Sequence, residues 1–300
     1  MSKGKDKIQL SKLVNMYDPH CVFDEVKAIV CMAYPNISLE LLTLVFRDIK
    51  DLFHGKYNGY RHCNTRYHDL RHTSDAFLAM ARLVHGAILE KEKISAENAI
   101  LALITALMHD VGYIQTVDDL KGTGAKYTEV HIDRSIKFMK NYFENNGFSK
   151  EQFKTCSDLI LCTDLHAKID KIRFSTLEAR FLGKMLGTAD LVGQMSDRTY
   201  LEKLPFLFQE FRESDINSYK NELDLIIKTV DFYHIIEKRL ANDLGNVIRF
   251  FPAHFNARYG ISENLYEEAI KSNMKHLKNH IKRSEIDYNK ALRRTKIVFN

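Results

Sequence analysis

Residues that break helices are scarce in this chain, since only 4 prolines and 13 glycines occur in 300 residues. A β-sandwich or barrel needs many turns rich in Gly and Pro, so this scarcity favours long helices. No segment alternates between apolar and polar residues for long enough to indicate a strand. Helix-start signals recur, at Ser38, Ser95, Ser149 with Gln152, and Ser175 with Glu178. The sequence therefore predicts an all-α fold.

The chain shows no internal repeat, low-complexity tract or proline-rich linker, so we expect a single domain over residues 1–300. Within it, we expect a loosely attached N-terminal extension over residues 1–37 and a core over residues 38–270. Residues 271–300 are expected to form a basic C-terminal helix. Apolar residues make up 45% and charged residues 28% of the chain, a composition that excludes global disorder.

The expected location is the cytoplasm. The five cysteines are scattered without a CxxC pair, which indicates reduced thiols, and the N-terminus lacks the apolar block of a secretory signal. The most apolar run, residues 99–108, is about half the length that spans a bilayer, so we expect no membrane partner.

The net charge of +5 is uneven, because residues 271–300 carry nine Lys or Arg against two acidic residues. A nucleic-acid partner is therefore disfavoured for the rest of the chain. A solvated helix face is the favoured interpretation of the basic segment, and a binding patch is the alternative.

Histidines concentrate in one part of the chain, where 7 of the 13 lie between residues 54 and 131. On a helix, His68, His72 and Asp75 would stand at i, i+4 and i+7 and would share one face. Such a face suits an inward-facing metal or acid–base site, although two ordinary histidines on a solvated surface are the favoured interpretation of the spacing taken alone. The spacing alone leaves both interpretations open.

Two carboxylates occur in settings where an unpaired charge is costly. His109 and Asp110 follow the apolar run, and Asp190 lies among apolar residues beside Gly187 and Gly193, which would let another backbone or a metal approach. A divalent cation would neutralise these groups. The alternatives are a helix end that emerges into solvent at Asp110, and an ordinary ion pair at Asp190.

Together, two imidazoles and two carboxylates make a ligand set that suits Fe, Mn, Zn or Mg. The set consists of His72, His109, Asp110 and Asp190. Hydrolysis of a phosphate ester needs such a site, together with an acid for the leaving group. His68 lies one helical turn before His72 and is the candidate acid.

The order His…His-Asp…Asp resembles the HD superfamily of metal-dependent phosphohydrolases. Within it, the segment YHDLRHTSDA resembles the pattern Y-H-N-x-x-H-A-x-D-V of class I cyclic-nucleotide phosphodiesterases. The similarity continues through His109-Asp110, through Cys162-Thr163-Asp164-Leu165 and through Ala189-Asp190. It covers roughly residues 60 to 200 and implies a compact multi-helix HD-domain fold that binds two divalent metal ions.

The resemblance also implies roles for individual residues. His72, His109, Asp110 and Asp190 would hold the first metal ion, with Asp110 bridging to the second, and His68 would protonate the departing oxygen. Tyr67 would line the substrate site. The residues implied to order metal-bound water or its neighbours are Glu129, His131, Thr163 and Asp164. For Glu129 and His131, a helix-opening pair is an equally good explanation.

The chain departs from the family pattern at several positions. Tyr113 stands where the family has a second histidine, and the asparagine that follows the last metal-binding aspartate is absent. Gln194 and Gln209 are only candidates for the glutamine that grips the purine. Phe250, Phe251 and Phe255 could stack on a base or could belong to the core, and the core is the favoured interpretation.

The sequence therefore predicts a metal-dependent phosphohydrolase, with a 3′,5′-cyclic nucleotide as the leading substrate and little discrimination between purines. An HD-type nucleotidase or phosphomonoesterase is the alternative enzyme. A degenerate HD domain that only binds a ligand is the alternative from another class. The expected partner is a small phosphate ester or nucleotide, and the oligomeric state is open.

Overall fold

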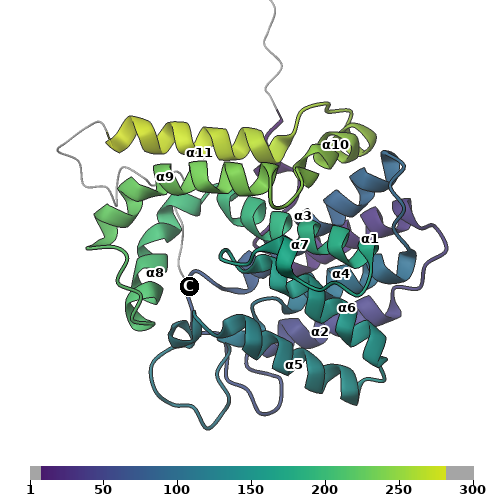
Figure 1. Ribbon diagram of the computed structural model, residues 1–300, viewed down its shortest axis with the longest axis horizontal. Coiled ribbons are helices and arrows are strands. Elements are labelled where there is room, and N and C mark those ends of the chain that lie inside the picture. Colours follow the sequence, from purple (N-terminus) through teal and green to yellow (C-terminus); the bar gives the residue numbers. More distant parts are fainter. Residues whose placement is uncertain (1–7, 282–300) are drawn as a thin grey trace, which may run out of the picture.

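The computed structural model describes residues 8–281, which fold into helices joined by short loops (Figure 1). The α-helices are α1 (Pro19–Ala33), α2 (Glu40–Phe53), α3 (Leu70–Leu89), α4 (Ala96–Met108), α5 (His131–Asn145), α6 (Lys150–Ile160), α7 (Leu177–Ser196), α8 (Tyr200–Glu213), α9 (Glu222–Ala241), α10 (Phe251–Tyr259) and α11 (Leu265–Ile281). Short 3₁₀ turns are η1 (Leu10–Lys12), η2 (Val111–Tyr113), η3 (Gly124–Tyr127), η4 (Leu161–Thr163), η5 (Ile169–Lys171) and η6 (Val247–Phe250). Between residues 8 and 281 no strand forms, and the all-α prediction is confirmed.

Helices α3 and α7 lie at the centre, and α1, α4, α6 and α11 pack around them (Figure 1). Glycines on α7 allow close contact with its neighbours. A Cβ atom at Gly193 would lie 3.1 Å from the backbone of Ala76 on α3, and one at Gly187 would lie 2.4 Å from the carbonyl oxygen of Cys162. The glycines around Asp190 therefore let neighbouring backbone segments pack closely against α7, which is one of the two roles expected from the sequence.

Two of the four helix-start signals are confirmed, at Ser95 and Ser149, whereas Leu39 rather than Ser38 precedes α2 and that helix has no side-chain cap. The Ser95 hydroxyl accepts a hydrogen bond from the Asn98 N–H, and Ser149 forms a complete capping box with Gln152. The prediction for α7 is wrong, because Thr176 rather than Ser175 caps that helix. Glu178 instead accepts hydrogen bonds from Ser95 and Asn98, and it thereby ties the start of α7 to the start of α4.

The N-terminal part of the chain does not form the loose extension that we expected over residues 1–37. Helix α1 buries Val22, Val26 and Ile29 completely and packs against α3, so residues 19–33 belong to the core. A single apolar cluster extends from Val22 to Leu277. The expected basic helix over 271–300 is seen in α11 as far as Ile281, and residues 1–7 and 282–300 lie outside the described part.

Two properties of the described helices bear on the expected environment. None of these helices combines the length and apolar character that crossing a membrane would require. The five cysteines are all unpaired, in agreement with the expected reduced thiols.

A pair of buried histidines joins α3 to α10. The Nδ1 atoms of His85 and His254 lie 3.0 Å apart, so one ring donates a hydrogen bond to the other. Burial lowers the pKa of His254 to about 2, and the nearby Arg82 guanidinium lowers it further in the same direction. Burial also lowers the pKa of His85. Both rings are therefore neutral in the folded protein near pH 7.

The free energy of unfolding should consequently fall as the pH falls below about 6.5. A histidine in the unfolded chain takes up a proton near that pH, whereas His254 in the folded chain does not, so each pH unit costs about 1.4 kcal/mol from this group. His254→Met removes the effect, and its stability should depend less on pH than that of the native chain by about this amount. Urea unfolding between pH 7.5 and 4.5 measures the difference. The exposed control His166→Gln should keep the native slope, and equal slopes for the native chain and His254→Met would contradict the prediction.

Candidate metal centre

Three helices bring the four expected ligand residues together. His72 lies in the first turn of α3, where the Asp69 side chain caps the helix by accepting a hydrogen bond from the His72 N–H at 2.9 Å. His109 and Asp110 follow the last residue of α4, and Asp190 lies within α7. All four residues are less than a tenth exposed. The expectation that Asp110 emerges into solvent is therefore excluded, and the two carboxylates face the imidazoles.

The ligand-type atoms converge on one point. His72 Nε2 lies 3.1 Å from Asp110 Oδ2 and 3.1 Å from Asp190 Oδ1. His109 Nε2 lies 3.2 Å from the same Asp110 oxygen, 3.7 Å from the same Asp190 oxygen and 3.4 Å from His72 Nε2. His72, His109 and Asp110 form a buried group whose ligand atoms could hold a metal ion.

These separations fit a divalent metal ion. Ligand atoms about 2.1 Å from a metal lie about 3.0 Å apart at adjacent octahedral positions and about 3.4 Å apart at tetrahedral ones. The observed range of 3.1–3.7 Å includes the tetrahedral value and begins near the octahedral one. In addition, Asp110 Oδ2 is buried and has no hydrogen-bond donor among the described residues. Two nitrogens and two carboxylate oxygens are a donor set that Zn, Fe and Mn accept.

The electrostatics of the four side chains agree with a cation site. Burial by itself lowers the pKa of His72, but the Asp110 and Asp190 carboxylates that face its Nε2 overcome this and raise it to about 9. The pKa of His109 is raised well above its usual range against the effect of burial, mainly by the charge of Asp110. Burial raises the pKa of Asp110, yet the imidazoles hold it well below the usual range. Without a metal, protons on the imidazoles balance the two carboxylates, and a metal ion would replace those protons.

The backbone around His109 fixes the direction of its ring. Its Nδ1–H donates to the Ala106 carbonyl at 2.8 Å, which leaves Nε2 to face the centre. Ser135 of α5 donates to the His109 carbonyl and accepts from the Gly112 N–H. A Cβ atom at Gly112 would lie 1.9 Å from the carbonyl oxygen of His131, so only glycine lets α5 approach this closely.

That approach brings His131 to the second oxygen of Asp110. His131 Nδ1–H donates to the Thr128 carbonyl at 2.6 Å, and Nε2 lies 3.7 Å from Asp110 Oδ1. Asp110 therefore faces two imidazoles through one oxygen and a third imidazole through the other. The sequence left two explanations open for His131, a residue of the site or a helix-opening residue. The structure places its ring at the site, beside Asp110.

Tyr113 packs against two of the imidazoles at the site. Its ring stacks on His68 at 4.3 Å and on His131 at 4.7 Å, with interplanar angles of 10° and 20°. Tyr113 is buried, so its ring fixes the spacing of the two imidazoles. The departure from the family pattern therefore places a tyrosine ring, instead of a further imidazole, against both His68 and His131.

His68 lies beside the centre but is not on the helix. Helix α3 begins at Leu70, so the expected helical stripe of His68, His72 and Asp75 is wrong. His68 Nδ1–H instead donates to Glu210 Oε2 at 2.7 Å, and the other Glu210 oxygen accepts from the Tyr67 N–H at 2.7 Å. This pairing orients the imidazole and leaves Nε2 without a constraint from Glu210.

Sequence reasoning missed Glu210, which is buried in α8 and connects that helix to the start of α3. Its apolar neighbours in the sequence could have indicated that its carboxylate is buried; they are Phe206, Leu207, Phe208 and Phe211. A carboxylate in such surroundings needs a partner, by the same argument that selected Asp190.

Tyr67 and Gln194 position Asp190. The buried Tyr67 hydroxyl donates to Gln194 Oε1 at 2.7 Å, and Gln194 Nε2 donates to Asp190 Oδ1 at 3.2 Å. In this structure Tyr67 thus acts through Gln194, which differs from the substrate contact expected for it. Gln194 is likewise engaged with a ligand residue, whereas Gln209 is exposed.

Several other expected site residues lie elsewhere. Glu129 is exposed. The Thr163 hydroxyl donates to the Ile160 carbonyl, and Asp164 accepts from the His166 N–H, so both support the local turn. No contact joins them to the four ligand residues within the described part of the chain. The three phenylalanines of the proposed stacking wall are at most 2% exposed and belong to the core, which was the favoured interpretation; they are Phe250, Phe251 and Phe255.

Comparison with known proteins gives one match. A family model described as Npun_R2479-like matches residues 57–266, a range that contains all the residues of the centre. No curated protein and no solved structure matches the chain.

Replacing Asp110 tests the centre directly. Asp110→Asn keeps the shape of the side chain but removes the charge that faces three imidazoles, so most of the bound divalent metal should be lost. Metal content of the purified protein, measured by mass spectrometry of the elements, checks this. Asp164→Asn is the matched control and should retain the native metal content. Native metal content in Asp110→Asn would contradict the assignment.

Proposed function

The chain belongs to the Npun_R2479-like family, and we propose that it is a metal-dependent phosphohydrolase of the HD type. The observation that carries the proposal is the convergence of His72, His109, Asp110 and Asp190 on one buried point. The order and approximate spacing of these residues, similar to those of HD phosphohydrolases, support the same function. The oriented His68 beside the centre adds the acid that ester hydrolysis needs.

The two carboxylates and two imidazoles would hold the divalent ion, which supplies a Lewis acid for the phosphoryl oxygens and an activated water as nucleophile. The chain contributes the rest of the chemistry. His68 would give its Nε2 proton to the ester oxygen as the phosphorus–oxygen bond breaks, and Glu210 would keep Nδ1 protonated and the ring directed. Asp110 would also keep His131 directed at its second oxygen.

A phosphodiester, with a 3′,5′-cyclic nucleotide as the leading example, is the substrate that the resemblance favours. A phosphomonoester or nucleotide is the second candidate, and Tyr113 favours it. This ring stacks on His68 and His131, and it stands at the chain position where the phosphodiesterase pattern has another histidine. A site with fewer groups for a second ion is still sufficient for a terminal phosphate held at one metal.

A substrate panel tests the proposal. The protein loaded with Mn²⁺ or Zn²⁺ is expected to hydrolyse bis-p-nitrophenyl phosphate and to convert cyclic AMP and cyclic GMP with less than about tenfold preference, since a larger preference needs about 1.4 kcal/mol of differential contact. Product formation is measured by absorbance and chromatography. Turnover of p-nitrophenyl phosphate and nucleoside monophosphates alone would select the monoesterase. Metal binding with no turnover of any ester would indicate a binding module and contradict the proposal.

The role of His68 can be separated from metal binding. His68→Gln should keep the native metal content but lose on the order of 10²–10⁴-fold in rate on an alkyl ester, because the leaving oxygen then lacks its proton donor. The loss should be smaller for p-nitrophenyl esters, whose leaving group needs little protonation. Steady-state rates on both esters measure this contrast. Glu210→Gln, which keeps a hydrogen-bond acceptor, should show a weaker form of the same pattern, whereas equal losses on both esters would rule out proton donation.

A further inference from the structure

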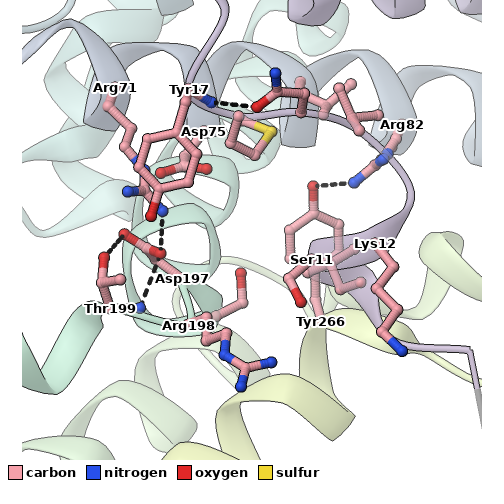
Figure 2. Close-up of a pocket in the computed structure, with 16 residues that line it drawn as sticks. Ser11, Lys12, Tyr17, Arg71, Asp75, Arg82, Asp197, Arg198, Thr199 and Tyr266 are labelled. Carbon is pink, nitrogen blue, oxygen red and sulfur yellow. Dashed lines mark hydrogen bonds and ion pairs between the residues drawn. The ribbon is translucent and has the colours of Figure 1, made fainter. Parts of the chain in front are cut away.

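A second polar site lies apart from the metal centre, in a cavity of about 490 Å³. The cavity is lined by η1 and the segment after it, by α3, by the end of α7 and by Tyr266 of α11 (Figure 2). None of the four metal-ligand residues lines it. Its size lies within the range of sites that bind small molecules.

Arg71, Asp75, Leu78 and Arg82 are spaced at i, i+4, i+7 and i+11, so they form one stripe of α3 along the cavity. Figure 2 shows Arg82 and Tyr266 on one side, with Arg71, Asp75 and Asp197 on the other. The sixteen lining residues include four basic and two acidic side chains, which gives the cavity an excess of two positive charges.

Arg82 is the decisive group, because it is a buried cation for which residues 8–281 supply no counter-ion. It is only 2% exposed. Its Nη1 donates to the Tyr266 hydroxyl at 3.0 Å, and its Nε and Nη2 have no hydrogen-bond partner among residues 8–281. The rings of Phe255 and Tyr266 lie 5.5 and 5.6 Å from the guanidinium carbon, and they soften the charge without neutralising it.

Two carboxylates, those of Glu25 and Asp197, are engaged by other cations, and a third, Asp75, lies with Arg71 on the opposite side of the cavity from Arg82 (Figure 2). Glu25 accepts hydrogen bonds from Arg258 at 3.1 and 3.3 Å and from the Tyr259 hydroxyl. Asp197 pairs with Arg71 at 2.6 Å and with Lys203 at 3.2 Å. An unpaired buried charge is costly, and a guanidinium is the side chain best suited to bind a carboxylate or phosphate through two hydrogen bonds.

We propose that this cavity binds a small organic anion whose carboxylate or phosphate pairs with Arg82. Tyr266 and Ser11 offer hydroxyl groups, and Leu10, Val14 and Leu78 offer apolar contact to the body of the ligand. The site is independent of the proposed hydrolase function, because its residues are separate from the four metal ligands. The anionic group of the ligand is either a carboxylate or a phosphate, and the titration below tests each of them separately.

Calorimetric titration of the native protein with benzoate, phenylphosphonate and neutral benzamide tests the proposal. Saturable binding of at least one anion is expected, with no binding of benzamide at the same concentrations. Benzoate binding alone would identify a carboxylate site, and phenylphosphonate binding alone would identify a phosphate site. The absence of saturable binding of both anions up to 10 mM, an upper limit of roughly 3 kcal/mol in affinity, would overturn the proposal.

Variants locate the binding. Arg82→Met replaces the cation by an apolar side chain of similar length and should weaken anion binding at least tenfold. Ser11→Trp fills the cavity from an exposed position, so it should block binding while the fold and Arg82 stay intact. Asp110→Asn is the control for the metal centre and should bind the anion with native affinity. Undiminished binding in Ser11→Trp, or loss of binding in Asp110→Asn alone, would place the anion elsewhere and overturn the proposal.

Discussion

The close approach of α7 to α3 is the contact on which the metal centre depends. Gly193 lets the two backbones meet near Ala76, and this brings Asp190 within 3.1 Å of His72. A larger residue at Gly193 would move the helices apart by a few tenths of an ångström, and metal–ligand distances tolerate little more than that. The small residues of α7 thus set the position of a charged group rather than only filling the core.

Residues of the candidate site are in turn held by neighbours from other parts of the chain. Ser135 binds the backbone of His109, and Tyr67 reaches Asp190 through Gln194. Glu210 does the same for His68. Such outer partners fix ring orientation and tautomer, so the ligand atoms need no large rearrangement to receive an ion. The centre is therefore built on rigid helices with its geometry established in advance.

The same helix pair carries two polar regions of opposite character. At the candidate metal centre two buried carboxylates favour the binding of a cation. In the cavity beside η1, the buried guanidinium of Arg82 favours the binding of an anion. Asp190 lies within α7 and Asp197 directly follows that helix, seven residues later; Asp197 pairs with Arg71 and Lys203, whereas Asp190 faces two imidazoles and the Gln194 amide. The difference in partners decides which carboxylate can serve as a metal ligand.

The sequence by itself predicted the helical fold and the four expected ligand residues of the centre. Scarce Gly and Pro predicted the helices, and the cost of burying a charge selected Asp110 and Asp190 because both lie in apolar surroundings. The order of histidines and aspartates identified His72 and His109. These signals are local, since they depend on the nearest few residues along the chain.

Only the tertiary structure decided which distant side chains join the centre. Glu210 lies 142 residues after His68, and Arg82 is left without a counter-ion because Arg258 occupies Glu25, which is 233 residues away in the chain. His131 and Glu129 look equivalent in sequence, but His131 begins α5 and faces Asp110, whereas Glu129 precedes that helix and is exposed. Pairings of this kind follow from how helices pack against one another, and helix packing depends on side-chain volumes summed over the whole core rather than on any local pattern.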